Sequence, residues 1–376
     1  MADSLYIHIP FCASKCNYCS FNSYAGLEGL QERYIESLCA ELAQNASGAH
    51  TEPLRTIFFG GGTPTLLSKN LLHKLLTFVL SSFSVLPDAE ISIEANPGTV
   101  DMEKFKLLHN AGVNRISFGV QSFNDQELKR IGRIHSAQEA VQAVNMAKTS
   151  GFGNISIDLM YGLPGQNAEN WQKNLETAIS LDLKHLSLYQ LTVEDQTPLA
   201  TLVSEGRLQM PDEDEIAAME DITAELTAEN GLSQYEISNY AQAGYQCRHN
   251  ITYWQNRDYF GVGAGAVSCL QGIRKQNMTN PETFCHLMDK GKSIVMEEEK
   301  LNPEASFRET VVMGLRMNRG VSKKELEKRY GMDFENYYDK VFHQLIADNL
   351  LEQSAEHIRL TDRGRTFANR VMAELV

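Results

Sequence analysis

The sequence lacks any apolar stretch long enough to cross a membrane as a helix. It also lacks the basic segment, apolar run and small-residue cleavage site of a secretory leader at its amino terminus. We therefore expect a cytoplasmic protein. Its 376 residues are 43% hydrophobic and 22% charged, a composition typical of soluble globular proteins. That length is sufficient for one large domain and a smaller one.

The chain is also poor in basic residues. Lys and Arg number 34 against 48 Asp and Glu, giving a formal net charge of -14. Such a surface would repel nucleic acid and anionic lipid, so neither is expected as the main partner. The cysteines number seven. An odd number in a reducing compartment argues against a disulfide framework and leaves thiolates free to bind metal.

Three of these cysteines lie close together. Cys12, Cys16 and Cys19 have C-x3-C-x2-C spacing, on a loop that follows a predicted strand. Three such thiolates can hold three corners of a cubane iron-sulfur cluster and leave the fourth iron without a protein ligand. Zinc would need a fourth ligand, and the only near one, His8, lies inside the strand. Plain packing is the other alternative, but thiols spaced this closely on a loop are poor core formers. The spacing favours the iron-sulfur cluster.

Strand and helix patterns alternate through the first half of the chain. The amino-terminal strand is followed by further apolar strands, each succeeded by a helical pattern, at 54–59, 89–95, 115–120, 154–161 and 185–191. Six such units predict parallel strands joined by right-handed crossovers. The polar motifs follow successive strands, which in a barrel would bring them to one mouth. In an open doubly wound sheet they would be spread along an edge. We therefore expect an α/β fold with a partial barrel over residues 1–200.

The pattern loosens after residue 200. In the predicted extension, 201–300, an acidic helix begins at 211–215, a strand is expected at 235–240, and 261–266 reads as a glycine-rich turn. Residues 301–376 form a separate pattern of helices, a hairpin and a last helix that resembles a winged helix. From Asn302 onward, the sequence contains twelve basic and twelve acidic residues, so this part carries no net charge. This domain lacks the basic surface of nucleic-acid binders, so packing against the barrel or a protein partner is expected.

The glycine run Gly60-Gly61-Gly62-Thr63-Pro64 follows the second strand. It could be an ordinary tight turn or a backbone cradle for a ligand. The absence of a Lys after the glycines excludes a Walker-type phosphate loop. Backbone without side chains lets a ligand lie flat, with carbonyl groups able to accept hydrogen bonds from an ammonium group.

Three further polar residues lie at or near the carboxyl ends of later strands, and a fourth follows the strand at 115–120. Taken singly, each could be a satisfied polar group at the rim of a barrel. Together they offer acceptors for hydroxyl and amino groups and one guanidinium suited to a carboxylate. These residues are Glu94, Gln121, Arg133 and Asp158.

The segment Cys247-Arg-His249-Asn250-Ile-Thr-Tyr253-Trp254 places a histidine beside aromatic residues. A lone histidine in such a setting is usually structural. As a haem ligand it would have Tyr253 and Trp254 as apolar walls, with Cys247 as a rival axial ligand.

The cysteine loop, with Tyr6-Ile-His-Ile-Pro-Phe-Cys12 before it, resembles the radical S-adenosylmethionine (SAM) superfamily. Within it, the chain is similar to the branch of oxygen-independent coproporphyrinogen III oxidases and related haem chaperones. The resemblance implies a partial (β/α)6 radical SAM barrel with a carboxy-terminal winged-helix-like α+β domain. It implies SAM and a 4Fe-4S cluster on Cys12, Cys16 and Cys19, with one-electron cleavage of SAM to methionine and a 5'-deoxyadenosyl radical. The SAM-binding residues implied are Tyr6, Tyr18, Gly61, Gly62, Thr63, Glu94, Gln121, Arg133 and Asp158.

The same resemblance bears on haem. His-Asn-x-x-Tyr-Trp is associated with haem binding in the chaperones, which implies His249, Asn250, Tyr253 and Trp254 as candidate haem-binding residues. The oxidases carry a longer amino-terminal segment and a fourth cysteine where this chain has Phe21. Both departures favour a haem chaperone that delivers haem to respiratory haem proteins at the membrane surface. Its cluster would support transfer or the formation of a homodimer. The alternatives are a radical enzyme, either a coproporphyrinogen oxidase or a SAM-dependent methyltransferase, and a winged-helix regulator, which the charge balance disfavours. Whether SAM is cleaved in function stays open.

Overall fold

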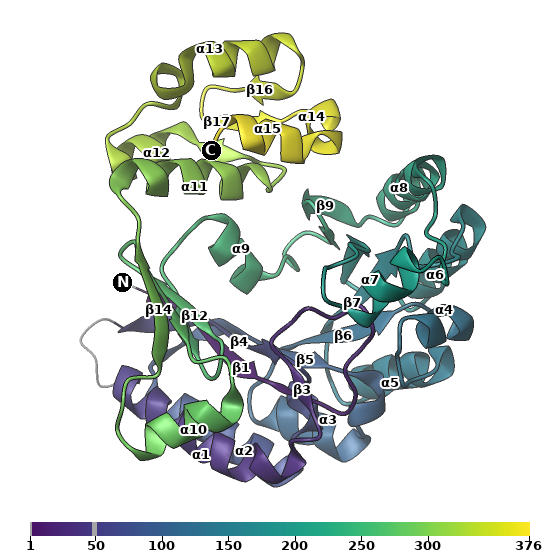
Figure 1. Cartoon of the computed structure of the whole chain (residues 1–376), viewed down its shortest axis with the longest axis vertical. Helices are drawn as coiled ribbons and strands as arrows, with labels where there is room; N and C mark the ends of the chain where they lie inside the picture. The colour runs from purple at the N-terminus through teal and green to yellow at the C-terminus, as the bar shows by residue number, and fades with distance from the viewer. Residues whose placement is uncertain (1, 47–50) are drawn as a thin grey trace.

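The structure is a computed structural model that describes residues 2–46 and 51–376. Figure 1 shows a large α/β part, in which helices pack along one long sheet. A smaller, mainly helical carboxy-terminal domain lies above it. Strand β14 (Val295–Lys300) runs from the large part toward the small one. Among the described residues, no helix has the length and apolar character needed to span a membrane.

The main sheet has nine strands in the order β11-β1-β4-β5-β6-β7-β8-β10-β9. Its six central strands are parallel and lie in the order of the sequence, which confirms the predicted alternation. These strands combine residues of the hydrophobic core with buried polar residues, such as Ser92 and Ser117. They are β1 (Ala2–Ile9), β4 (Thr51–Gly61), β5 (Val85–Ala95), β6 (Arg115–Gln121), β7 (Asn154–Tyr161) and β8 (His185–Gln190).

Helices between the strands pack their apolar faces on the sheet and form one hydrophobic core with it. Ser68 caps one of them by accepting a hydrogen bond from the Leu71 N–H, and Ser136 with Glu139 forms the predicted capping box of another. The helices are α1 (Gln31–Ala46), α2 (Lys69–Ser82), α3 (Met102–Asn110), α4 (Asp125–Arg130), α5 (Ala137–Thr149) and α6 (Ala168–Ser180).

The two edges of the sheet come from residues beyond 200. Strand β11 (Phe260–Val262) lies parallel to β1, so the prediction of a turn beginning at residue 261 was wrong there. A Cβ on Gly261 would lie 2.0 Å from the Val267 carbonyl oxygen. The glycine that suggested a turn thus allows a close approach of backbone within a strand. At the other edge, the strand expected at 235–240 is divided into β9 (Ser233–Glu236) and β10 (Asn239–Ala241).

The segment that connects β10 to β11 joins the two edge regions of the curved sheet. It contains helix α9 (Arg248–Trp254), which lies between the sheet and the carboxy-terminal domain (Figure 1). Helix α9 contacts Ser4, in the first half of β1, and Thr56, the sixth of the eleven residues of β4, which are neighbours in the sheet. These contacts place α9 on the amino-terminal side of the parallel strands, away from the ends that carry the cysteine loop and the glycine run. The cysteine loop follows the carboxyl end of β1. Helix α9 and the cysteine loop therefore occupy opposite ends of the barrel.

The carboxy-terminal domain has its own hydrophobic core, which includes Phe307, Phe334 and Phe342. Its elements follow the helix, strand, helix, helix, hairpin order of a winged helix. They are α11 (Pro303–Leu315), β15 (Val321–Ser322), α12 (Lys323–Tyr330), α13 (Phe334–Ala347), β16 (Leu351–Gln353), β17 (His357–Leu360), α14 (Asp362–Thr366) and α15 (Ala368–Glu374).

The remaining elements belong neither to the main sheet nor to the carboxy-terminal domain. A small sheet lies next to β11, and three helices and one short strand pair complete the described fold. They are β12 (Val267–Leu270), β13 (Ile273–Asn277), β14, α7 (Pro198–Ser204), α8 (Glu213–Glu229), α10 (Pro281–Asp289), β2 (Phe11–Cys12) and β3 (Tyr24–Ala25).

Candidate functional site

The cysteine loop is fixed by hydrogen bonds on both sides. The Asn17 N–H donates to the Ile131 carbonyl at 3.0 Å, and the Leu199 N–H donates to the Asn17 carbonyl at 2.9 Å. The side-chain amide of Asn22 donates to the Ala264 and Thr279 carbonyls. Segments distant in sequence thus hold the loop in place before any ligand binds.

The three thiols of this loop are half-buried, and none forms a disulfide. The Cys16 sulfur accepts a hydrogen bond from Arg133 Nη1 at 3.3 Å, and the Cys12 sulfur accepts one from Thr63 Oγ1 at 3.8 Å. Burial raises the pKa of the Cys12 thiol. Donors to sulfur stabilise thiolates that bind iron, so the donor set fits a 4Fe-4S cluster.

Two buried polar atoms beside the loop have no hydrogen-bond partner within the described residues. They are Arg133 Nε and Asn96 Oδ1, and their residues line a small hollow next to Cys16. Arg133 also donates to the Gly119 carbonyl. The Gln121 side chain lies close to the same glycine. The hollow, of about 10 Å³, therefore offers an unpaired guanidinium N–H and an amide oxygen to one small polar group of a ligand.

The glycine run lies at the carboxyl end of β4, next to the His8 ring of β1. Gly61 has φ of +116°, and a Cβ there would lie 2.5 Å from the ring of His8. Its N–H donates to Glu94 Oε2 at 3.0 Å. A Cβ on Gly62 would lie 2.7 Å from the Phe11 carbonyl oxygen. Each of these two positions thus requires glycine for a steric reason.

The tautomer of His8 follows from its partners. Nε2 lies 2.9 Å from the Asn22 carbonyl oxygen, which can only accept, so Nε2 carries the proton. Nδ1 then accepts from the Tyr6 hydroxyl at 2.9 Å. His8 thereby connects the end of the cysteine loop with Tyr6 and orients the phenol toward the barrel interior.

A cavity of about 190 Å³ lies inside the barrel. Three predicted SAM-binding residues, Tyr6, Glu94 and Asp158, line it together with His249, Asn250 and Tyr253 from α9. Gly61, Gly62, Thr63, Gln121 and Arg133 do not line this cavity. Tyr18 is placed elsewhere, against the small core around Ile131 and Met160, while Trp254 is absent from the cavity lining.

The cavity contains two carboxyl groups and one guanidinium. Burial and then the charge of Asp158 raise the pKa of Glu94 to about 7. Burial likewise raises the pKa of Asp158, against the stabilising hydrogen bonds of Ser187 and Ser117. Arg115, 2% exposed, lies among them, and its Nε has no hydrogen-bond partner in the described chain. This interior is suited to polar, hydrogen-bonding ligand groups rather than to an apolar ring.

His249 is completely enclosed. Its Nδ1 lies 2.8 Å from Thr56 Oγ1 and its Nε2 lies 2.8 Å from the Tyr253 hydroxyl. Its ring stacks on Phe58 with 5.2 Å between centroids. Burial lowers its pKa to about 3, so the imidazole is neutral at pH 7. To ligate a haem iron, it would have to give up one of these two hydrogen bonds.

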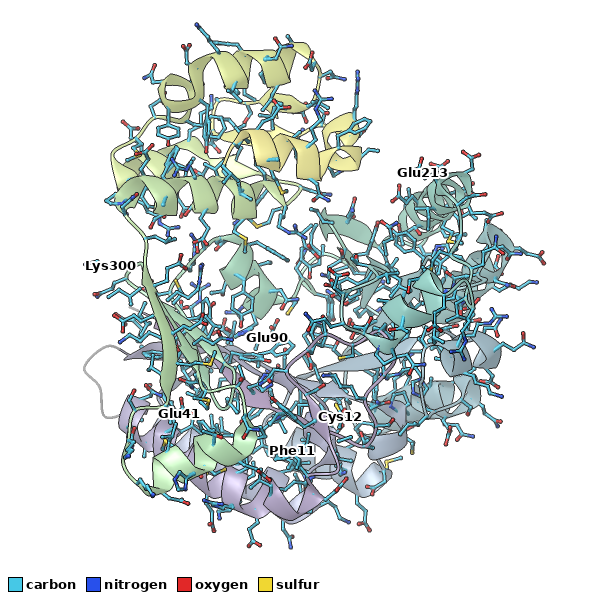
Figure 2. The ribbon with its side chains drawn as sticks, viewed as in Figure 1. Phe11, Cys12, Glu41, Glu90, Glu213 and Lys300 are labelled. Carbon is cyan, nitrogen blue, oxygen red and sulfur yellow. The ribbon has the colours of Figure 1, made fainter. Side chains whose placement is uncertain are left out.

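The start of α9 is held by a carboxylate from the sheet. Glu90 accepts from the N–H groups of Arg248 at 2.8 Å and His249 at 3.1 Å. The Cys247 thiol contacts the same carboxylate at 3.5 Å, and burial raises its pKa to about 12. In Figure 2, Glu90 is labelled close to α9, and Cys12 of the cysteine loop is labelled farther from that helix. Cys247 is therefore a buried, protonated thiol in this arrangement.

Several residues of the site were not predicted from the sequence. Thr56, Glu90 and Arg115 belong to β4, β5 and β6, and each is buried. The only signal was a charged or polar residue inside a strand buried on both faces, which requires a partner. The identity of that partner depends on α9, more than 130 residues later, and could not be predicted from local pattern.

Comparison with known proteins places this geometry in a family. A model of the Radical SAM superfamily matches residues 6–178, and a model of the HemN C-terminal domain matches residues 301–367. The fold is similar to that of coproporphyrinogen III oxidase (HemN) from Escherichia coli, a radical SAM enzyme, with a TM-score of 0.86. That likeness covers 99% of this chain and 89% of the other, at 22% identity.

Curated relatives match over nearly their whole lengths. The chain is 38% identical to heme chaperone HemW of Bacillus subtilis, covering 98% of this chain and 97% of that protein. It is 37% identical to heme chaperone HemW of Escherichia coli, with coverage of 98% and 97%. The chain therefore belongs to the radical SAM superfamily, whose members are built around a 4Fe-4S cluster and SAM, and within it to the HemW family.

Proposed function

We propose that this protein is a haem chaperone that binds a 4Fe-4S cluster, SAM and haem and delivers haem to respiratory haem proteins at the membrane surface. The observation that supports this most is the similarity to heme chaperone HemW over 98% of the chain, which includes both the cysteine loop and α9. The unpaired polar atoms beside Cys16 independently support a bound SAM.

Cys12, Cys16 and Cys19 are the proposed cluster ligands. When bound, the cluster supplies one electron to SAM for reductive cleavage of its sulfonium. The residues of this chain bind and orient. Arg133 donates to Cys16 and keeps its Nε free for a carboxylate. Thr63 donates toward Cys12 and fixes the end of the glycine run.

The remaining SAM contacts follow from position. The backbone of Gly61 and Gly62 offers carbonyl groups to the amino group of SAM, and Glu94 supports this turn by accepting from the Gly61 N–H. Acceptors for the ribose hydroxyls come from the barrel wall. We assign that part to Gln121 and Asp158, of which Asp158 lines the interior cavity together with Tyr6. Tyr18, within the cysteine loop, is assigned a further contact.

Haem is assigned to the α9 segment of His249, Asn250, Tyr253 and Trp254. The first three line an interior cavity whose carboxyl and guanidinium groups do not suit an apolar porphyrin ring. Trp254 instead faces the carboxy-terminal domain. In this arrangement, His249 and Tyr253 position α9, and contact with haem is made from the side of Trp254.

The proposal is tested by a haem titration of the anaerobically reconstituted protein. One haem bound per chain, with no loss of SAM binding, is the expected result. Absence of saturable haem binding would refute the proposal.

A second function is favoured by the fold, because the HemN likeness extends over 99% of the chain. A porphyrinogen oxidase would convert coproporphyrinogen III in the presence of SAM and a reductant. Mass spectrometry of that anaerobic reaction distinguishes the two functions. We expect no decarboxylated product, and turnover to such a product would favour the enzyme.

A further inference from the structure

A second pocket lies outside the barrel, between the carboxy-terminal end of α9 and the winged-helix domain. Its volume is about 270 Å³ and it is open to solvent on one side. Trp254 lies on its α9 side, and β15, α12 and β17 form the opposite side. Trp254 is thus the one residue of the His-Asn-x-x-Tyr-Trp motif that lines this pocket.

The pocket is basic in a chain of net charge -14. Arg257, Arg319 and Arg329 line it, against one acid, Glu325. Arg329 donates to the carbonyls of Gln255 and Asn256, which ties α12 to the end of α9. Arg257 lies 3.9 Å from Glu325. Arg319 is exposed and has no ion pair within the described residues, so its charge is available to an anion.

The Trp254 side chain packs against a cation and carries an unpaired donor. Arg316 lies over the Trp254 ring, 4.7 Å from its centroid. The indole Nε1 is buried and has no hydrogen-bond partner in the part of the chain that the structure describes. An indole N–H left unpaired in a buried position carries a desolvation cost that an oxygen acceptor would remove.

A histidine completes the pocket. His357, at the start of β17, lines it and is half-buried. No hydrogen bond to its ring nitrogens occurs within the described residues, whereas both ring nitrogens of His8, His185 and His249 are hydrogen-bonded. An imidazole whose ring nitrogens have no protein partner can ligate a metal.

We propose that this pocket receives the carboxylate-bearing edge of a haem, with Arg319 pairing a propionate, Trp254 lying against the porphyrin ring and His357 as an axial ligand of the iron. This inference rests on the proposed haem-binding function and assigns it to a site. It explains why an enclosed His249 and an accessible Trp254 belong to one motif. The former positions α9, and the latter contacts the ligand.

The experiment is a haem titration of the full-length protein followed by absorption spectroscopy, comparing wild type with His357→Ala. The matched control is His343→Ala, an exposed histidine of α13 in the same domain that does not line the pocket. Loss of an axial ligand should shift the Soret band and weaken haem binding about tenfold in His357→Ala, but not in the control. Added imidazole should restore the wild-type spectrum.

An unchanged spectrum and affinity in His357→Ala would overturn the assignment while the proposed function stands. No haem binding by wild type would refute the proposed function itself. Equal melting temperatures of wild type and variant show that a spectral change does not arise from unfolding.

A second variant tests the carboxylate contact. Arg319→Ala should weaken binding of haem severalfold yet leave binding of haem dimethyl ester unchanged, because the ester lacks the anionic groups. Equal weakening for haem and its ester, or none for either, would contradict the pairing of Arg319 with a propionate.

Discussion

The Nδ1 of His249 lies 2.8 Å from the hydroxyl oxygen of Thr56. This contact joins helix α9 to the middle of β4, the second central strand, which lies far earlier in the sequence. Through this contact, α9 closes the end of the barrel that lies opposite the cysteine loop. The stability of the barrel should therefore depend on the first residue of the haem-associated motif.

His249→Ala should lower the free energy of unfolding by about 2–4 kcal/mol, because it leaves a cavity and unpaired hydroxyls. Chemical denaturation measures the change. Asn250→Ala, which alters a half-buried neighbour in the same helix without removing this ring, is the control and should cost less. Equal and small losses in both variants would show that α9 does not close the barrel as described.

Removal of single cysteines tests the cluster. Cys12→Ser, Cys16→Ser and Cys19→Ser should each lose most bound iron and sulfide after anaerobic reconstitution, since a cubane held by three ligands does not tolerate the loss of one. Cys269→Ser, a half-buried cysteine of β12, is the control and should retain both. Tetrahedral zinc in place of iron would contradict the cluster assignment.

Gly61→Ala tests the glycine run. A Cβ at this position meets the His8 ring at 2.5 Å and requires φ of +116°, so a loss of about 2–4 kcal/mol is expected. SAM affinity, measured by calorimetry, should fall with it. Gly98→Ala provides a matched control, because no atom lies within 4 Å of a Cβ there. Unchanged SAM affinity in Gly61→Ala would remove this turn from the proposed site.

Glu41 predicts a dependence of stability on pH. It lies on α1 (Figure 2) and accepts hydrogen bonds from the Gly263 N–H and the Asn277 amide. Burial is the main cause that raises its pKa to about 7. Because the folded-state pKa exceeds the unfolded value, its contribution is fully present below about pH 4.5 and is lost as pH rises to 7.

The difference in unfolding free energy between wild type and Glu41→Gln should therefore fall by up to about 3 kcal/mol between pH 5 and 8. Glu32→Gln, an exposed residue of the same helix, should show no such trend. Parallel pH profiles for wild type and Glu41→Gln would show that the buried Glu41 carboxyl does not cause the pH dependence.

The central barrel was predictable because its strands and helices carry strong local patterns. The six parallel strands and the capping box at Ser136 followed from hydrophobic periodicity and capping chemistry. Strand β11 was not predicted, since three residues with a central glycine have no strand pattern of their own. Its pairing with β1 is set by tertiary contact.

The site was predictable to a different extent. Residues near the carboxyl ends of strands, such as Glu94 and Asp158, were expected at one barrel mouth because parallel strands bring their carboxyl ends together. Both lie within their strands and line the interior cavity. The position of α9 was not, because nothing local indicates that Glu90 caps it. Its two-sided character, with His249 inward and Trp254 outward, appears only when the winged-helix domain is in place.

The central claim is that this protein carries haem and passes it on. The most direct test incubates the haem-loaded, cluster-containing protein with membrane vesicles that hold a haem-free respiratory acceptor, then measures haem in the re-isolated membranes. The account predicts that the acceptor gains haem faster than from free haem at the same concentration. Haem that stays on the chain, or arrives no faster than free haem, would contradict it.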